Sequence, residues 1–237
     1  MRTFSDTVFE MQNYNSLFIY LLMYAAFLSP VTAQRNSLYG PTGLISIPTA
    51  EKVVEQEETL AAWYSFSSQD NHFGFSASLS VADTLEFSAF NDMGSSIRDG
   101  SSAILSLKYT PDSRFAAGYM HDMHKRHRDV LYGVFGKPEQ GVYLGGGITL
   151  GNESLSVLGN YSATTRSVNR TFFMAGARIE LSEIHPGLEG LMEFNGETTN
   201  FGLAFKPENF VQLQLDYFTR GDWLNEDKYV LSSNLKF

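Results

Sequence analysis

The chain alternates apolar and polar residues with a period of two, from about residue 59 to residue 237. Such alternation places successive side chains on opposite faces of a β-strand. Within 200–206, for example, Phe201, Leu203 and Phe205 share one face, and polar or small residues fill the other. The pattern predicts strands at 59–66, 73–80, 84–90, 101–109, 114–120, 155–161, 171–181, 188–194, 200–206, 211–217 and 229–237, with fainter glycine-rich candidates at 130–136 and 142–150.

The second face of these strands distinguishes a soluble sandwich from a membrane barrel. That face is solvated in a sandwich, whereas in an outer-membrane barrel it lines the lumen and the apolar face meets lipid. Short connections at 81–83, 111–113 and 207–209 alternate with longer polar ones, and aromatic residues lie near strand ends, which favours the barrel. We predict that nine charged residues line the lumen, nearly balanced and forming ion pairs: Glu86, Lys108, Arg178, Glu180, Glu189, Glu193, Lys206, Asp216 and Lys236.

The strand count contains a conflict. Thirteen candidates are found, but a bacterial barrel with both ends in the periplasm needs an even number of strands. The alternation of short and long connections fails within 129–151, so we predict that one crossing there is misassigned. The prediction is an all-β, antiparallel transmembrane barrel of about twelve strands, or fourteen if Leu44–Ile47 adds one.

The N-terminal region has the pattern of an export signal. Residues 17–28 form an uncharged apolar run, long enough for a signal peptide and too short to span a bilayer as a helix. Small residues follow, and we expect cleavage after Ala33, although the preceding region is not basic and Met11 is an alternative start. A buried N-terminal helix is the alternative. The expected organisation is a signal peptide at 1–33, a periplasmic or strap segment at 34–58 and an outer-membrane barrel at 59–237.

The last predicted strand resembles the C-terminal signal by which barrel-assembly machinery recognises outer-membrane proteins. The sequence ends at Phe237, and Tyr229, Leu231 and Leu235 share its face. We therefore expect localisation in the bacterial outer membrane. The expected partners are the barrel-assembly machinery, membrane lipid and lipopolysaccharide, together with polysaccharide or export components.

Composition narrows the remaining functions. A net charge of −9 disfavours nucleic acid as a partner. The absence of cysteine excludes disulfides, thiol catalysis, thiolate metal sites and lipoprotein anchoring. We predict no cofactor.

Residues 40–50 read GPTGLISIPTA. Glycine permits positive φ and proline fixes φ, so this segment suits a turn-rich strap across a lumen, with a periplasmic lead-in as the alternative. It resembles the N-terminal signature of the YjbH-like family of outer-membrane barrels, and segments 78–90 and 192–217 are also similar to that family. The resemblance implies a role in exopolysaccharide production or export. The matching residues are Gly40, Gly43, Leu44, Pro48, Thr49 and Ala50.

The densest polar cluster lies at 121–129 and contains three histidines. Imidazole is a common metal ligand, but at strand spacing His124 points away from His121 and His127, and adjacent basic residues repel a cation. A basic external loop touching lipopolysaccharide phosphates and a plain solvated loop are the other interpretations.

Catalysis would require an acid/base pair and usually a nucleophile. Asp92 with His121 or Asp122 could form such a pair near an external rim, but no Gly-x-Ser-x-Gly motif occurs. We therefore predict no enzyme activity and no metal site. The three functions that remain are a barrel supporting polysaccharide export, a small porin or structural barrel, and a barrel enzyme.

Overall fold

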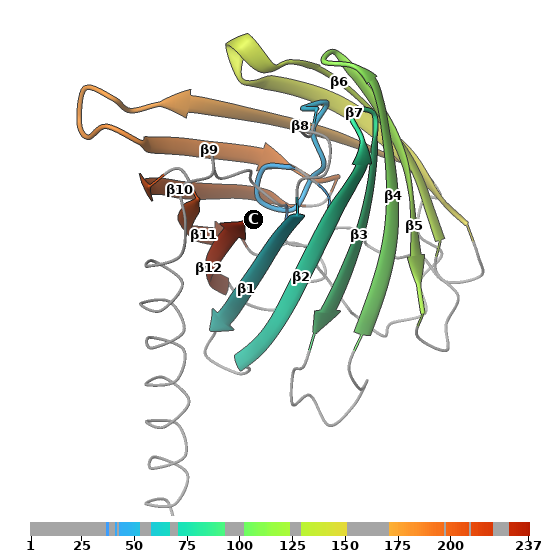
Figure 1. The fold of residues 1–237 in the computed structure, drawn as a ribbon, viewed down its shortest axis with the longest axis horizontal. Helices are drawn as coiled ribbons and strands as arrows, with labels where there is room; N and C mark the ends of the chain where they lie inside the picture. Colours follow the sequence, from blue (N-terminus) through green and yellow to red (C-terminus); the bar gives the residue numbers. More distant parts are fainter. Residues whose placement is uncertain are drawn as a thin grey trace, which may run out of the picture.

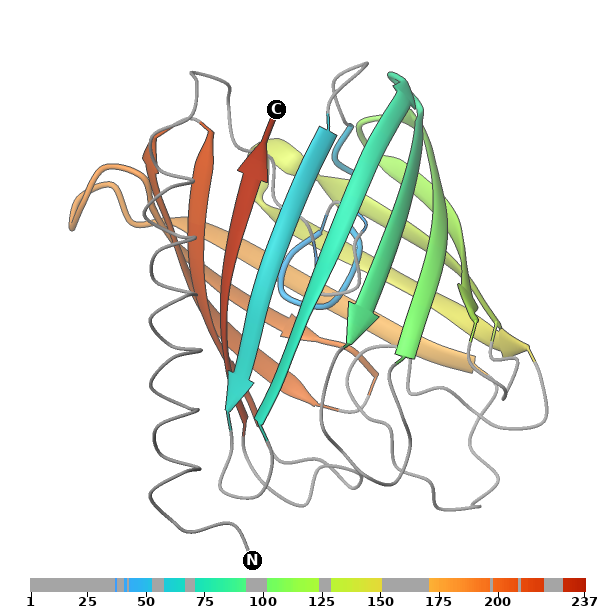
Figure 2. The ribbon, with the colours of Figure 1, turned by 60° about the horizontal axis from the view of Figure 1, so that its bottom comes forward.

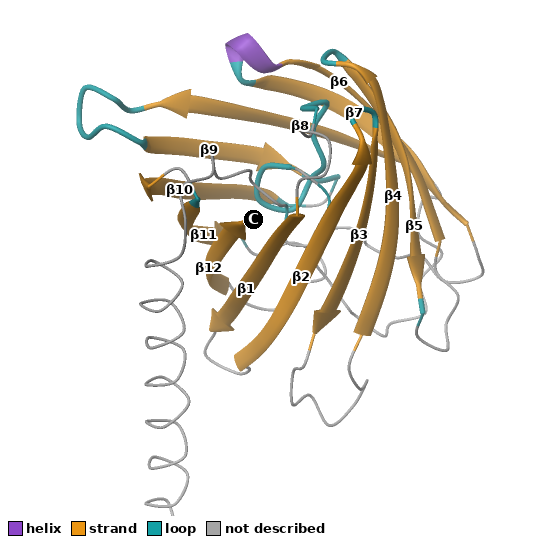
Figure 3. Cartoon of the chain, viewed as in Figure 1, coloured by secondary structure: helices purple, strands orange, loops and turns teal. Residues whose placement is uncertain are grey.

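The structure, a computed structural model, describes residues 37, 41, 43–52, 58–66, 71–92, 102–123, 129–150, 171–196, 198–208, 210–219 and 228–237. Within these ranges, no helix is long and apolar enough to cross a membrane. The elements in chain order (Figure 1, Figure 3) are β1 (Glu58–Phe66), β2 (Asn71–Ala82), β3 (Leu85–Asp92), β4 (Ser102–Asp112), β5 (Phe115–Asp122), β6 (Asp129–Lys137), the 3-10 helix η1 (Pro138–Gln140), β7 (Val142–Leu150), β8 (Thr171–Glu180), β9 (Leu188–Phe194), β10 (Thr199–Glu208), β11 (Val211–Phe218) and β12 (Lys228–Lys236).

These strands form a closed antiparallel barrel in which each strand pairs with its neighbours in the sequence. The barrel closes where β1 pairs with β12, from Thr59 opposite Lys236 to Phe66 opposite Tyr229. Closure removes the two unpaired edges that an open sheet would expose. The predicted all-β barrel of twelve antiparallel strands is confirmed.

The predicted position of the misassigned crossing is wrong. Both glycine-rich candidates within 129–151 are strands, β6 and β7. The barrel closes with β7 paired directly to β8, from Val142 opposite Ala177 to Ile148 opposite Thr171. The candidate strand at 155–161 lies outside the described residues, and Leu44–Ile47 is no barrel strand, because only an isolated bridge joins Gly43 to Pro48 around it.

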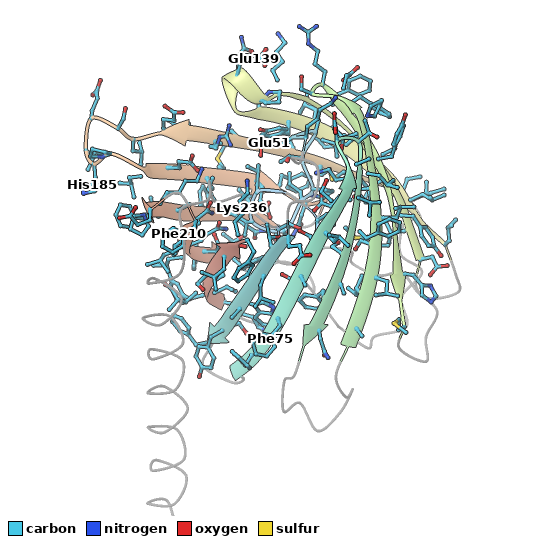
Figure 4. The ribbon with its side chains drawn as sticks, in the orientation of Figure 1. Glu51, Phe75, Glu139, His185, Phe210 and Lys236 are labelled. Atoms are coloured by element: carbon cyan, nitrogen blue, oxygen red, sulfur yellow. The ribbon has the colours of Figure 1, made fainter. Side chains whose placement is uncertain are left out.

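The two ends of the barrel differ in their connections. We call the end with the short connections the turn end: residues 83–84, 113–114 and 209–210 each join two strands there, and Phe237 lies at the same end (Figure 2). The other end is the loop end, and most of its connections are longer. The hairpin between β8 and β9 is the longest at the turn end, and His185 lies at its tip, beyond the rest of the wall (Figure 4).

Side chains alternate between the lumen and the outer wall, as the period-two pattern predicts. Along β4, Ile104, Ser106 and Lys108 are buried, whereas Leu105 and Tyr109 are exposed. The same division continues around the barrel, so large apolar side chains cover the outer wall. Its exposed members include Leu79, Phe87, Leu131, Phe135, Leu144, Phe173, Met192, Phe201, Leu203 and Leu215.

The C-terminal residue joins the closing seam. The backbone N–H of Phe237 donates to the carbonyl of Glu58, at 2.9 Å, and the aromatic side chain is exposed. Removal of Phe237 should therefore slow barrel assembly while leaving export across the inner membrane unchanged. Outer-membrane levels and heat-modifiable gel migration measure this, with a Phe237→Tyr variant as the control that retains an aromatic ring. Normal levels and migration of the truncated protein would refute the assembly signal.

Candidate functional site

Residues 43–50 lie inside the barrel and are all buried. We call this segment the strap. It forms a tight loop, in which Gly43 and Pro48 are bridged and the N–H of Leu44 donates to the carbonyl of Ile47, at 3.0 Å. Figure 2 shows the strap as the blue loop that the strands enclose. The first described residues of the chain therefore occupy the lumen of the barrel that follows them.

Glu193 of β9 holds the tip of the strap. Its Oε2 accepts hydrogen bonds from three successive backbone amides, those of Ile45 (3.1 Å), Ser46 (3.0 Å) and Ile47 (3.2 Å). The Ser46 hydroxyl also donates to the same carboxylate. On its other side, Asn200 of β10 donates to Oε1, at 2.9 Å. Successive amides directed at one point form an anion-binding nest, so the buried carboxylate is satisfied by the strap itself.

The apolar side chains of the strap fit against glycines of the wall. A Cβ added at Gly176 would lie 2.3 Å from Leu44 Cδ1 and 2.9 Å from Ile47 Cδ1. A Cβ at Gly202 would lie 3.2 Å from Ile45 Cδ1. Gly176 on β8 and Gly202 on β10 both face the lumen, and a Cβ there would require strap side chains to shift, together with Asp216 in the case of Gly202. The glycines on the polar face therefore provide space for this segment.

A second anchor follows the strap at Glu51. Its Oε1 accepts hydrogen bonds from the Arg178 guanidinium at 2.7 Å and from the Tyr143 hydroxyl at 2.5 Å. The predicted lumen position of Glu180 is wrong, because Glu180 is exposed at the end of β8, while Arg178 pairs with Glu51. Glu51 was not among the predicted site residues, although it directly follows the Pro-Thr-Ala motif.

Most of the other predicted lumen charges are buried in short-range polar contacts. Lys108 and Glu86 are 3.2 Å apart, and Lys206 and Glu189 are 3.0 Å apart. The Asp216 carboxylate accepts hydrogen bonds from the side-chain amide of Gln214, two residues earlier on β11, at 2.9 Å. Burial of a charge is costly unless it is paired and hydrogen-bonded, so these contacts offset part of the cost of placing charges in the lumen. Lys236 is also buried.

Toward the loop end the lumen is lined by apolar side chains. The rings of Trp63 and Phe90 stack with centroids 5.5 Å apart. They belong to one core that includes three strap residues. A pocket beside Trp63 and Ile45 has a volume of about 10 Å³, room for about one water molecule. We call the following inward-facing set the apolar layer: Trp63, Phe90, Ile104, Met120, Val130, Phe218 and Val230.

The 121–129 cluster is only partly described. His121 lies on the outer wall, and its Nδ1 is 2.6 Å from Asp129 Oδ1. Asp92, the expected acid/base partner of His121 or Asp122, has its side chain outside the described residues, as do Asp122, His124 and His127. Among the residues that the structure describes, no group of three His, Asp or Glu side chains could hold a metal ion.

The structure gives a different reason for the presence of glycine at position 43 than the positive φ that the sequence suggested. The described glycines with positive φ are Gly141, Gly187 and Gly196, and Gly43 is not among them. Close packing requires it instead, since an added Cβ would lie 2.2 Å from the Ile47 carbonyl oxygen. The remaining motif residues Leu44, Pro48, Thr49 and Ala50 belong to the strap, whereas Gly40 lies outside the described residues.

Gly43→Ala should therefore destabilise the barrel by about 1–3 kcal/mol, the usual effect of overpacking. The matched control is Gly133→Ala on β6, where the nearest atom to an added Cβ is 3.8 Å away. Unfolding titrations in lipid vesicles compare the two. Equal free energies of unfolding for both variants would mean that the strap loop is not packed as described.

Comparison with known proteins adds little to this geometry. No protein-family model and no curated protein sequence matches the chain. Among solved structures, outer membrane phospholipase A from Escherichia coli is similar with a TM-score of 0.40 and 12% identity, over 84% of this chain and 95% of that one. The N-terminal β-barrel domain of OprF from Pseudomonas aeruginosa gives a TM-score of 0.27 and 12% identity, over 77% and 98%. Similarity at this level carries no information on function, and the barrel assignment rests on strand pairing.

Proposed function

We propose that the chain is an outer-membrane barrel whose own strap keeps the lumen closed, and that it supports surface-polysaccharide production or export. The observation that carries the closed state is the carboxylate of Glu193, which accepts hydrogen bonds from three successive strap amides. A sealed lumen distinguishes this protein from a constitutively open porin.

The outer wall supports membrane placement. Large apolar side chains are exposed around the barrel, and an exposed apolar surface of that extent is unfavourable in water but suits lipid. Aromatic side chains collect toward the loop end, where Tyr229 stacks on Phe66 with centroids 5.5 Å apart and contacts Tyr217 in a tilted arrangement with centroids 5.2 Å apart. Such rows are typical of the girdle at a membrane interface.

The polysaccharide role is supported by the resemblance of the strap motif to YjbH-like barrels. Five of the matching positions belong to the strap and flank the three residues that bind Glu193, which supports a role of the motif in shaping this loop. The motif thus has a physical task within this chain, to seal the barrel. We propose no catalytic role.

Planar-bilayer recordings test the closed state. The intact protein should conduct little, whereas deletion of residues 38–50 should open the lumen, because a twelve-strand barrel is wider than the eight-strand barrels that side chains fill. The control is deletion of the turn-end segment 182–184, which leaves the strap in place. Equal conductance of the intact and strap-deleted proteins would favour a small porin. Silence of both would show that the apolar layer closes the barrel without the strap.

Cells test the polysaccharide role separately. Loss of the gene should lower the amount of surface or secreted polysaccharide, and expression of the intact chain should restore it. Expression of the strap-deleted chain, at an equal level in the outer membrane, should restore less. Unchanged polysaccharide in the deletion strain would leave a structural envelope barrel as the function.

A further inference from the structure

A hydrogen-bonded polar cluster interrupts the apolar outer wall at the loop end of β5 and β6. The Tyr119 hydroxyl donates to Asp129 Oδ2, at 2.6 Å, and His121 Nδ1 lies 2.6 Å from Asp129 Oδ1. The two rings stack with centroids 6.4 Å apart and planes 19° from parallel. Both carboxylate oxygens are thus engaged, and the cluster is fixed across two adjacent strands.

Register places this cluster on the lipid-facing side. Met120 and Val130 are buried on the lumen side, so their neighbours Tyr119, His121 and Asp129 face outward. Three exposed leucines surround the cluster. Leu105 on β4 lies opposite His121, Leu150 on β7 lies opposite Asp129, and Leu131 lies two residues further along β6.

The depth of the cluster follows from the strand ends. Asp129 is the first residue of β6, and His121 is next to the last residue of β5. A charged group on the lipid face is tolerated near the bilayer surface far better than at its midplane. The cluster therefore lies at the level of the lipid headgroups, if the barrel spans the membrane as proposed above.

The chemistry of the cluster favours a cationic ligand. The Asp129 carboxylate accepts the proton on Nδ1, so in the neutral ring Nε2 is a hydrogen-bond acceptor. The side chain of His121 is 39% exposed and remains accessible. The Asp129 carboxylate and the acceptor Nε2 together attract a cation that carries N–H donors. The basic residues that were expected to repel a bare metal ion, Lys125, Arg126 and Arg128, lie outside the described residues. A bare phosphate would be repelled by Asp129.

We propose that Tyr119, His121 and Asp129 bind a primary ammonium group presented at the membrane surface, such as that of an ethanolamine headgroup or an amino sugar. This site uses the outer wall and is independent of the strap. It rests on the proposed membrane placement alone, so it can fail while the closed lumen stands.

Native mass spectrometry of the full chain with an equimolar mixture of three dioleoyl lipids tests the site. Phosphatidylethanolamine should be retained about tenfold over phosphatidylcholine, the effect of one charge-assisted hydrogen bond. The two lipids differ only in the N-methyl groups that replace the N–H donors. Phosphatidylglycerol, which has no ammonium group, should be retained no better than phosphatidylcholine.

The variants Asp129→Asn and His121→Phe should abolish the preference, whereas Phe173→Leu, elsewhere on the outer wall, should keep it. Heat-modifiable migration verifies that each variant is folded. Soluble glucosamine assigns the source of the ammonium group: displacement of the lipid shows that amino sugars enter the site, and no displacement restricts it to lipid. Equal retention of all three lipids, or a preference that survives Asp129→Asn, would overturn the proposal.

Discussion

Replacement of Glu193 by alanine should lower the free energy of unfolding by at least about 3 kcal/mol, because each buried donor left without an acceptor costs about 1–3 kcal/mol. Three strap amides and the Ser46 hydroxyl would lose their common acceptor, and Asn200 would lose one as well. Urea titrations in lipid vesicles measure the loss. The strap, which is buried in the lumen, should also become accessible to solvent.

Two variants separate the anchor from a general effect of removing a lumen charge. Glu189→Ala deletes another inward glutamate of β9, whose partner Lys206 is partly exposed, and should cost less. Glu193→Gln keeps the shape and one acceptor oxygen, so its effect should be intermediate. If Glu189→Ala and Glu193→Ala are equally destabilising, the hydrogen bonds to the strap do not determine the stability.

Substitution of an outer-wall residue should lower the free energy of unfolding by a similar amount, for a different reason. Leu203 is half exposed near the middle of β10, so Leu203→Arg should cost about 2–4 kcal/mol if that position is near the bilayer midplane. The matched control is Ile184→Arg in the hairpin at the turn end, where the side chain is 74% exposed. Folding titrations in vesicles compare the two. Equal tolerance of arginine at both positions would contradict a lipid-facing wall.

The period-two pattern was sufficient to predict the barrel because each strand buries only one face. Alternation alone assigned Leu203 to the outside and Lys108 to the inside, and the structure places them there. The strand count was harder, because β6 and β7 contain many glycines and their pattern is faint. Gly145 and Gly147 have close neighbours on the adjacent strands β6 and β8, so their small size reflects packing that the sequence does not reveal.

The contacts of the strap could not be predicted from the sequence. Glu193 and Ser46 are 147 positions apart, and nothing in their local sequence indicates that they meet. Glu193 was predicted to be one of several lumen charges that form ion pairs, whereas its partners are three backbone amides, the Ser46 hydroxyl and the Asn200 side chain. Backbone donors carry no sequence signature, so this kind of anchor is visible only in the structure.

The apolar layer was also unexpected. A lumen was predicted to be polar, but Phe90, Ile104 and Val130 interrupt that pattern at inward positions. These residues fit the alternation poorly because both faces of their strands are apolar there. The strap explains part of the difference, since its own leucine and isoleucines join the same core.

The central claim is that the strap lies sealed inside the barrel, and cysteine labelling tests it most directly. The chain contains no cysteine, so a single Ala50→Cys change creates one reporter at a fully buried strap position. Ile184→Cys is the exposed control. In the folded, reconstituted protein a water-soluble maleimide should label Cys at 184 quickly and leave Cys at 50 unlabelled until the barrel is unfolded. Equal labelling rates at the two positions in the folded protein would contradict a strap-sealed lumen.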